Sequence, residues 1–147
     1  MSFGNNVYNT LNSVTQTAWT PELRFGGATT GITYNAVLGD YHRIGNIVFY
    51  RFSINLSSKG SATGDATIAG LPFTVGTNVV GQLPQQNNLD LNANFTVAFT
   101  LSNSTTTSLI LRQSGPTTAT STIPLTNANF SNNTLLTGSG FYFALIS

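Results

Sequence analysis

Residues 46–56 read NIVFYRFSINL, and this stretch constrains the fold more than any other part of the chain. The odd positions of the stretch become polar towards its end. The even positions are all apolar, and they are Val48, Tyr50, Phe52, Ile54 and Leu56. Because successive side chains of a β-strand point to opposite faces, a period of two predicts a strand that buries its even face.

Shorter β-forming segments recur along the chain, separated by residues typical of turns. Further strands are expected at residues 17–25, 31–35, 41–44, 66–69, 79–83, 108–113 and 121–125. Turns are expected at residues 25–27, 38–40, 60–64, 113–116 and 131–133. No segment shows a sustained apolar period of 3.6 residues, so the sequence predicts an all-β fold, an antiparallel β-sandwich of the jelly-roll kind.

Residues 95–101 (FTVAFTL) show a second clear alternation. Thr and Ala occupy every second position between larger apolar side chains. The pattern predicts that the larger side chains face the core, and these are Phe95, Val97, Phe99 and Leu101.

The last predicted strand is apolar on both faces, since residues 140–146 read GFYFALI. Such a strand either lies in the centre of a sandwich or has one face covered by another subunit. On the second interpretation, Phe141, Phe143 and Leu145 form a contact between subunits. A homotrimer with closed symmetry would cover them without leaving an exposed edge.

Charged residues are scarce, at 6% of the chain with a net charge of +1, whereas apolar residues reach 40%. This apolar content is enough to drive collapse, so the chain is expected to fold. The five basic residues are scattered, which argues against binding of nucleic acid and of anionic membranes. Cysteine is absent and no apolar run is long enough to span a bilayer.

Few residues could carry catalysis. The four carboxylates are dispersed along the sequence, and they are Glu22, Asp40, Asp65 and Asp90. The one histidine, His42, would need an acid to orient it and a nearby hydroxyl, and a partly exposed strand position is the favoured interpretation. One His without Cys argues against zinc, and there is no calcium loop or phosphate-binding glycine loop. The sequence therefore predicts a protein that is not an enzyme and holds no cofactor or metal.

A carbohydrate-binding groove is compatible with the composition, because aromatic rings stack on sugars while Asn and Thr bond their hydroxyl groups. The candidate stacking residues are Trp19, Tyr34, Tyr41, Tyr50 and Tyr142. On the alternative interpretation, Tyr50 and Tyr142 lie in core or interface strands. Nothing in the sequence singles out one sugar site.

Residues 1–17 are expected to form an N-terminal arm ahead of a single β-sandwich domain at residues 18–147. The arm is polar and shows no secretory signal. Ordering such a segment costs about 1–2 kcal/mol per residue, which sparse apolar side chains do not offset. The segment is either a loosely packed terminus or an arm that becomes ordered on a partner, against the trimer base or the capsid surface. In the second case the contacts to the capsid are Phe3, Val7, Tyr8 and Leu11.

Two blocks of the chain resemble a module of tailed-bacteriophage virion proteins. They are residues 19–35 (WTPELRFGGATTGITYN) and 39–73 (GDYHRIGNIVFYRFSINLSSKGSATGDATIAGLPF). The shared features are a Trp-Thr-Pro opening, Phe-Gly-Gly and Ser-Lys-Gly-Ser turns, Ile-Gly-Asn, and Gly-Leu-Pro-Phe. The module occurs in capsid decoration, head-fibre and tail-fibre-tip proteins. The resemblance covers the first half of the chain and implies a trimeric β-structure without enzymatic activity.

The module does not by itself assign a place on the virion. Only 17 residues separate Met1 from the module, too few for a fibre shaft, which favours a free-standing protein. We expect a capsid decoration (cement) protein, made in the host cytoplasm, that binds the outer capsid surface and stabilises contacts between major capsid proteins. The alternative is a host-recognition module, a fibre tip or receptor-binding protein with a host surface glycan as its partner.

Overall fold

The computed structural model describes residues 15–115 and 122–146. Its strands are β1 (Thr17–Ala18), β2 (Glu22–Phe25), β3 (Ile32–Ile44), β4 (Ile47–Lys59), β5 (Ala66–Ala69), β6 (Val75–Thr77), β7 (Val80–Leu89), β8 (Val97–Ser102), β9 (Ser108–Ser114), β10 (Ile123–Pro124) and β11 (Phe130–Ala144). One short 3-10 helix, η1 (Asn127–Asn129), precedes β11. All strand pairs in the described residues are antiparallel, so the predicted all-β antiparallel fold is confirmed.

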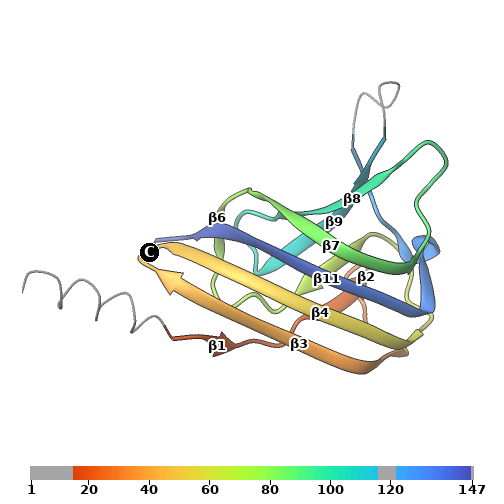
Figure 1. Cartoon of the computed structure of the whole chain (residues 1–147), viewed down its shortest axis with the longest axis horizontal. Coiled ribbons are helices and arrows are strands. Elements are labelled where there is room, and N and C mark those ends of the chain that lie inside the picture. Colours follow the sequence, from red (N-terminus) through yellow and green to blue (C-terminus); the bar gives the residue numbers. More distant parts are fainter. Residues whose placement is uncertain (1–14, 116–121, 147) are drawn as a thin grey trace, which may run out of the picture.

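These strands form one sheet that curls on itself, so that its two halves face each other like the layers of a sandwich. The strand order is β1-β3-β4-β11-β7-β8-β9-β5-β2, with β10 added to β9 and β6 added to β11. In Figure 1, β3, β4, β11 and β7 form the near layer, and β9 and β2 lie behind it. The hydrophobic core lies between the two halves, because each half buries the face that it turns to the other.

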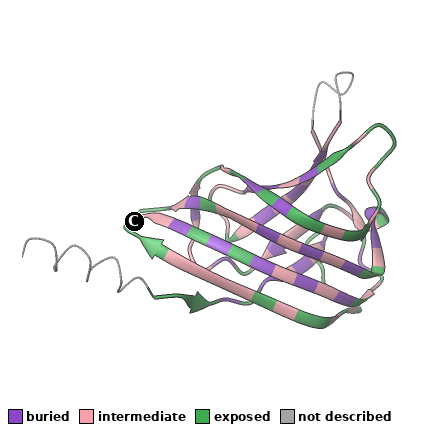
Figure 2. Ribbon diagram, viewed as in Figure 1, coloured by how far each residue is buried: buried purple, intermediate pink, exposed green. Residues whose placement is uncertain are grey.

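The even face of β4 lies in this core, as its sequence pattern predicts. Its five even side chains, from Val48 to Leu56, are each at most 3% exposed. Figure 2 shows buried residues recurring at every second position along β4. The same core cluster includes residues of the far half, among them Leu23, Phe25, Ile68, Leu109 and Leu111. Burial of each such side chain stabilises the fold by about 1.5–3 kcal/mol.

Trp19 joins the two ends of the curled sheet. β1 and β2 lie at opposite ends of the strand order, yet only residues 19–21 separate them in the chain. The Trp19 indole N–H donates to the carbonyl oxygens of Asp40 and Arg51, at 3.2 Å each. Its backbone N–H donates to the carbonyl of Gly39 at 3.0 Å. The Trp-Thr-Pro segment therefore holds the curled sheet closed.

Gly39 is part of β3, and the turn predicted at residues 38–40 is wrong. β3 runs without interruption from Ile32 to Ile44. A Cβ atom at Gly39 would lie 2.6 Å from the Trp19 carbonyl oxygen and 2.8 Å from Pro21 Cδ. Glycine at this position admits the Trp-Thr-Pro segment against the strand, since any side chain would hold it away.

The Phe-Gly-Gly turn and the connection at residues 60–64 are confirmed, and they pack on each other. Phe25 and Ala28 exchange two backbone hydrogen bonds of 3.0 Å. Between them Gly26 has a φ of 58°, in the left-handed region that favours glycine. A Cβ atom at Gly64 would lie only 2.8 Å from Gly26 Cα. The motifs that carry the resemblance to phage proteins therefore hold the fold together.

Two further predictions of strand boundaries are wrong. The single strand predicted at residues 17–25 is two strands, because the Trp-Thr-Pro segment carries the chain from one end of the sheet to the other. The turn predicted at residues 131–133 lies within β11, where the pairing with β7 shifts register. Ser131 donates its N–H to the Thr134 hydroxyl at 2.8 Å, which satisfies the backbone where the ladder is interrupted.

β8 is turned over relative to its sequence pattern. Thr100 and Ser102 are fully buried, whereas Val97 is 54% exposed. Phe99 and Leu101 lie on the same outward side as Val97 and are partly exposed. The prediction that these apolar side chains face the core is therefore wrong.

The inverted orientation of β8 follows from the ring of Tyr50, which reaches across to this strand. The Tyr50 and Thr100 hydroxyl groups are 3.0 Å apart and hydrogen-bonded. A Cβ atom at Gly81, the register partner of Thr100, would run into both hydroxyl groups. Only small side chains fit beneath the tyrosine, so β8 turns Ala98 and Thr100 inward.

Candidate interaction surface

The near layer and the neighbouring strand β8 turn a second face to solvent, which we call the outer face. It consists of the outward side chains of β3, β4, β11, β7 and β8. On it Phe49 of β4 pairs in register with His42 of β3 and Phe141 of β11. The Phe49 and Phe141 ring centres are 6.1 Å apart, and Phe143 follows 5.9 Å from Phe141. Phe49 is 44% exposed, so the group of aromatic rings is open to solvent.

The apolar character of the outer face continues on β7 and β8. Val80 pairs in register with Leu101, and both Val80 and Val97 are more than half exposed. The large exposed hydrophobic residues of the described chain are Leu38, Ile44, Phe49, Val80, Val97, Phe141, Leu145 and Ile146. Because soluble monomers rarely expose contiguous apolar patches, this clustering is typical of an interaction surface.

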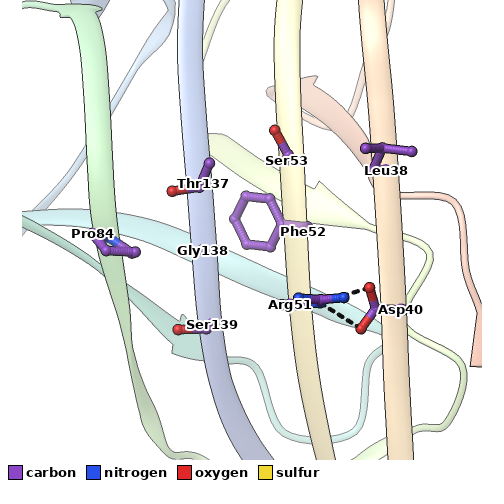
Figure 3. A pocket seen from close by; sticks show the side chains of 9 residues that line it. All are labelled: Leu38, Asp40, Arg51, Phe52, Ser53, Pro84, Thr137, Gly138 and Ser139. Atoms are coloured by element: carbon purple, nitrogen blue, oxygen red, sulfur yellow. Dashed lines mark hydrogen bonds and ion pairs between the residues drawn. The ribbon is translucent and has the colours of Figure 1, made fainter. Parts of the chain in front are cut away.

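An ion pair crosses the outer face between two hollows. Arg51 Nε donates to both carboxylate oxygens of Asp40, at 2.7 Å each, as Figure 3 shows. Beside the pair lies a hollow of about 410 Å³, with Leu38 on one side, Pro84 on the other and the Gly138 backbone between them. A Cβ atom at Gly138 would run into the buried Phe52 ring, so the missing side chain makes room for Phe52 and not for a partner.

The second hollow, of about 470 Å³, lies on the other side of the same ion pair. His42 and Phe49 line it, together with Gln16, which precedes β1. The two hollows share Asp40 and Arg51, so they lie next to each other on the outer face, and we call the two together the groove. Its chemistry is mixed, with aromatic and aliphatic walls around a single ion pair.

The candidate catalytic residues are not brought together. Asp40 faces Arg51, Glu22 faces Arg24 with an O–N distance of 2.5 Å, and no other ion pair occurs in the described residues. No group of three or more His, Asp or Glu side chains suited to a metal ion forms within residues 15–115 and 122–146. Asp40 and His42 line the same hollow, and Asp40 is held by Arg51.

Three of the five candidate sugar-stacking residues lie in the core. Trp19 is 8% exposed, and Tyr50 and Tyr142 are at most 3% exposed. Burial raises the pKa of Tyr50, and it raises the pKa of Tyr142 to about 12. The hydroxyl of Tyr34 accepts the Leu23 N–H at 2.9 Å, so its ring serves to join β3 to β2.

The exposed aromatic side chain in the groove is Phe49, which the sequence reasoning did not single out. The sequence feature that could have identified Phe49 is its odd position in β4, on the face opposite the buried even residues. Of the predicted subunit-contact residues, Phe141 and Phe143 lie beside it on the outer face. Leu145 lies beyond the end of β11, where its N–H donates to the Thr74 carbonyl at 2.8 Å. A trimer stays a prediction.

The predicted capsid-contact residues Phe3, Val7, Tyr8 and Leu11 lie outside the described residues. The turn predicted at residues 113–116 and the strand predicted at residues 121–125 also extend beyond them in part. β9 continues to Ser114, and β10 occupies residues 123 and 124.

No protein-family model matches the chain, and no curated protein matches it in sequence. Among solved structures, the crystal structure of the Dettilon tailspike protein is similar, with a TM-score of 0.72 and 18% sequence identity over 88% of this chain. The chain spans 24% of the tailspike protein. At this identity the likeness shows a shared fold. In the described part of the chain, no helix is long and apolar enough to cross a membrane.

Proposed function

We propose that this protein is a non-enzymatic structural protein of a tailed-phage virion, a homotrimer that binds the outer capsid surface and cements neighbouring major capsid proteins. The observation that carries the proposal is the open apolar outer face, on a fold that is shared with a phage tailspike protein. Such a face needs a partner, because exposed aromatic clusters favour association. The motif blocks that resemble phage virion modules support the same setting.

Closed threefold symmetry is the simplest way to cover the outer face. Phe49, Phe141 and Phe143 would then pack against the corresponding faces of two other copies. Charged residues are depleted in the cores of stable interfaces and aromatic residues are enriched, which matches the composition of this face. The Asp40–Arg51 ion pair carries no net charge, so it is less costly to enclose than either residue alone.

The proposed action is mechanical. A trimer on a local threefold position of the capsid touches several capsid subunits at once. Its interfaces add to those of the shell and must break before the shell does. The absence of catalysis is part of the proposal, and the dispersal of the chain's four carboxylates supports it.

The test is whether the purified protein binds capsids or host cells. Purified protein should bind to capsids that lack it, in a fixed ratio to the major capsid protein, and should raise the temperature at which they break. Binding to host cells with no binding to capsids would contradict the proposal.

A host-recognition role is the second candidate, and the groove beside Asp40 and Arg51 favours it. Its polar groups and the Phe49 ring are suited to a host surface glycan, and the similar solved structure is a tailspike. The two roles use the outer face differently, because a trimer that encloses this face closes the groove. A stable monomer that binds host cells would favour the second candidate.

A further inference from the structure

One end of the molecule collects exposed apolar residues beside the outer-face aromatic group, since Ile47 pairs in register with both Ile44 and Phe143. The turn from β3 to β4 lies at this end and begins with exposed Ile44. β11 ends beside the turn, since the Ala144 N–H donates to the Asn46 carbonyl at 2.7 Å. Leu145 and Ile146 follow, 55% and 76% exposed. Figure 1 shows the C-terminal end of the chain next to the β3–β4 turn.

Arg43 lies in the middle of this apolar end. Its guanidinium carbon is 4.2 Å from the centre of the Phe73 ring, and its Nε donates to the Gly45 carbonyl at 2.8 Å. A hollow of about 420 Å³ opens beside it, bordered by Phe73 and Leu145. Arg43 pairs with no carboxylate side chain in the described residues, and these residues contain all the Asp and Glu of the chain.

We propose that this terminal patch, made of Arg43, Ile44, Phe73, Leu145 and Ile146, docks onto an apolar surface that carries a carboxylate on another protein of the virion. The inference rests on the proposed function, since it names the surface by which the protein attaches. The Phe73 ring and the Gly45 carbonyl already restrict the arginine side chain, so binding costs it little further freedom. An arginine set among apolar residues is also typical of the few positions that dominate interface energies.

The charge pattern selects this kind of partner over others. Nucleic acids and anionic membranes are recognised by clusters of basic residues, whereas the terminal patch holds one cation. In a second copy of this chain, Glu22 and Asp40 already hold arginines of their own, which leaves Asp65 and Asp90, and the mass measurement below tests that partner. A single carboxylate within an apolar surface satisfies both the arginine and its surroundings.

The experiment measures binding of the purified full chain to capsids that lack it. Arg43→Glu reverses the charge at the patch, Arg43→Gln removes it, and Ile146→Ser reduces the apolar contact. Lys59→Glu is the matched control. It changes the charge by the same amount as Arg43→Glu, but at the opposite end of β4. We expect Arg43→Glu to weaken capsid binding at least tenfold and Arg43→Gln and Ile146→Ser to weaken it less. Lys59→Glu should bind like the unaltered protein.

Thermal unfolding and mass in solution are measured for each variant, so that loss of binding is not misread. Equal binding by Arg43→Glu and the unaltered protein would overturn the inference while leaving the proposed function intact. A lower oligomeric state for Arg43→Glu would also overturn it, because the patch would then join copies of this chain. Arg43-dependent binding to anionic lipid vesicles would overturn the inference as well, because the partner would then be a membrane and not a protein. If the unaltered protein itself does not bind capsids, the proposed function fails and the inference fails with it.

Discussion

Single glycines on β11 make room for aromatic rings on β4. Gly138 pairs in register with Phe52, and Gly140 pairs with Tyr50. The rings lie over the glycines, so a Cβ atom at Gly138 would run into the Phe52 ring. Cover by a cross-strand aromatic ring offsets the low strand preference of glycine. The two glycines therefore stabilise the sheet by leaving room for the rings of Phe52 and Tyr50.

Gly138→Ala should destabilise the protein by about 1–3 kcal/mol, because the added methyl group overpacks the core against Phe52. Gly138 does not have a positive φ, so the loss would come from the contact and not from the backbone. The measurement is urea unfolding of both single variants and of the double variant with Phe52→Leu. The double variant should lose less than the sum of the single variants. Additive losses would contradict the contact.

At the scale of elements, β11 is tied to the segment that follows β5 through Tyr142. The Tyr142 hydroxyl donates to the Phe73 carbonyl at 3.1 Å and accepts the Phe73 N–H at 3.3 Å. Desolvation by burial raises the pKa of Tyr142 to about 12, from 10.0 in the unfolded chain. Between these values the unfolded chain has lost a proton that the folded protein keeps. Stability from this group is therefore complete below pH 10 and is lost as the pH rises towards 12.

The free energy of unfolding should fall by about 1.4 kcal/mol per pH unit between pH 10 and 12 on account of Tyr142 alone. Tyr142→Phe should be less stable at pH 7, because the Phe73 backbone loses its partner. It should also show a shallower fall at high pH, since the titrating group is gone. Urea unfolding from pH 8 to pH 11.5 measures both effects. Parallel curves for the two proteins would show that Tyr142 does not titrate as described.

β8 provides a second test at the scale of elements, because its structure and its sequence pattern place opposite residues in the core. Ala98→Asp should destabilise the protein by several kcal/mol, since it buries an unpaired charge. Val97→Asp should change the stability by less than about 1 kcal/mol, since Val97 is exposed. Denaturant unfolding of the two variants decides between the orientations. A larger loss of stability for Val97→Asp than for Ala98→Asp would favour the orientation that the alternation predicts.

At the scale of the whole molecule, the outer face and the terminal patch are two adjoining surfaces with different compositions. The outer face holds an aromatic group and an internally neutral ion pair, whereas the terminal patch holds an arginine that pairs with no carboxylate side chain of the described residues. A ring of identical copies needs surfaces that close on themselves, and attachment to another protein needs a surface left free. The proposals assign one surface to each task.

Phe141→Asp should convert the proposed trimer into a folded monomer, because Phe141 is partly exposed in a single chain but would be buried between copies. Phe49→Asp should do the same, since the two rings are neighbours. Light scattering at micromolar concentration gives the mass, and circular dichroism reports whether the chain remains folded. Lys59→Asp serves as a control and should leave the mass unchanged. A monomeric unaltered protein would rule out the trimer.

The sequence by itself determined the fold class, the inward face of β4 and the glycine turns around residues 26 and 60–64. These features depend on local rules, namely the period of two in a strand and the backbone freedom of glycine. The same rules placed Phe141 and Phe143 on the face opposite Tyr142, because side chains alternate along β11. The wide spacing of the four carboxylates along the sequence also argued against a catalytic group.

Only the tertiary structure decided that Gly39 lies in a continuous strand, that β8 is turned over, and that Phe49 and Arg43 belong to surfaces. Each of these depends on residues distant in the sequence. Trp19 needs the space beside Gly39, and Tyr50 restricts β8 to small inward side chains. Arg43 meets Phe73 only because the sheet curls and brings the turn beside that loop. Alternation says that the two faces of a strand differ, but the volume left by the opposite layer decides which face is buried.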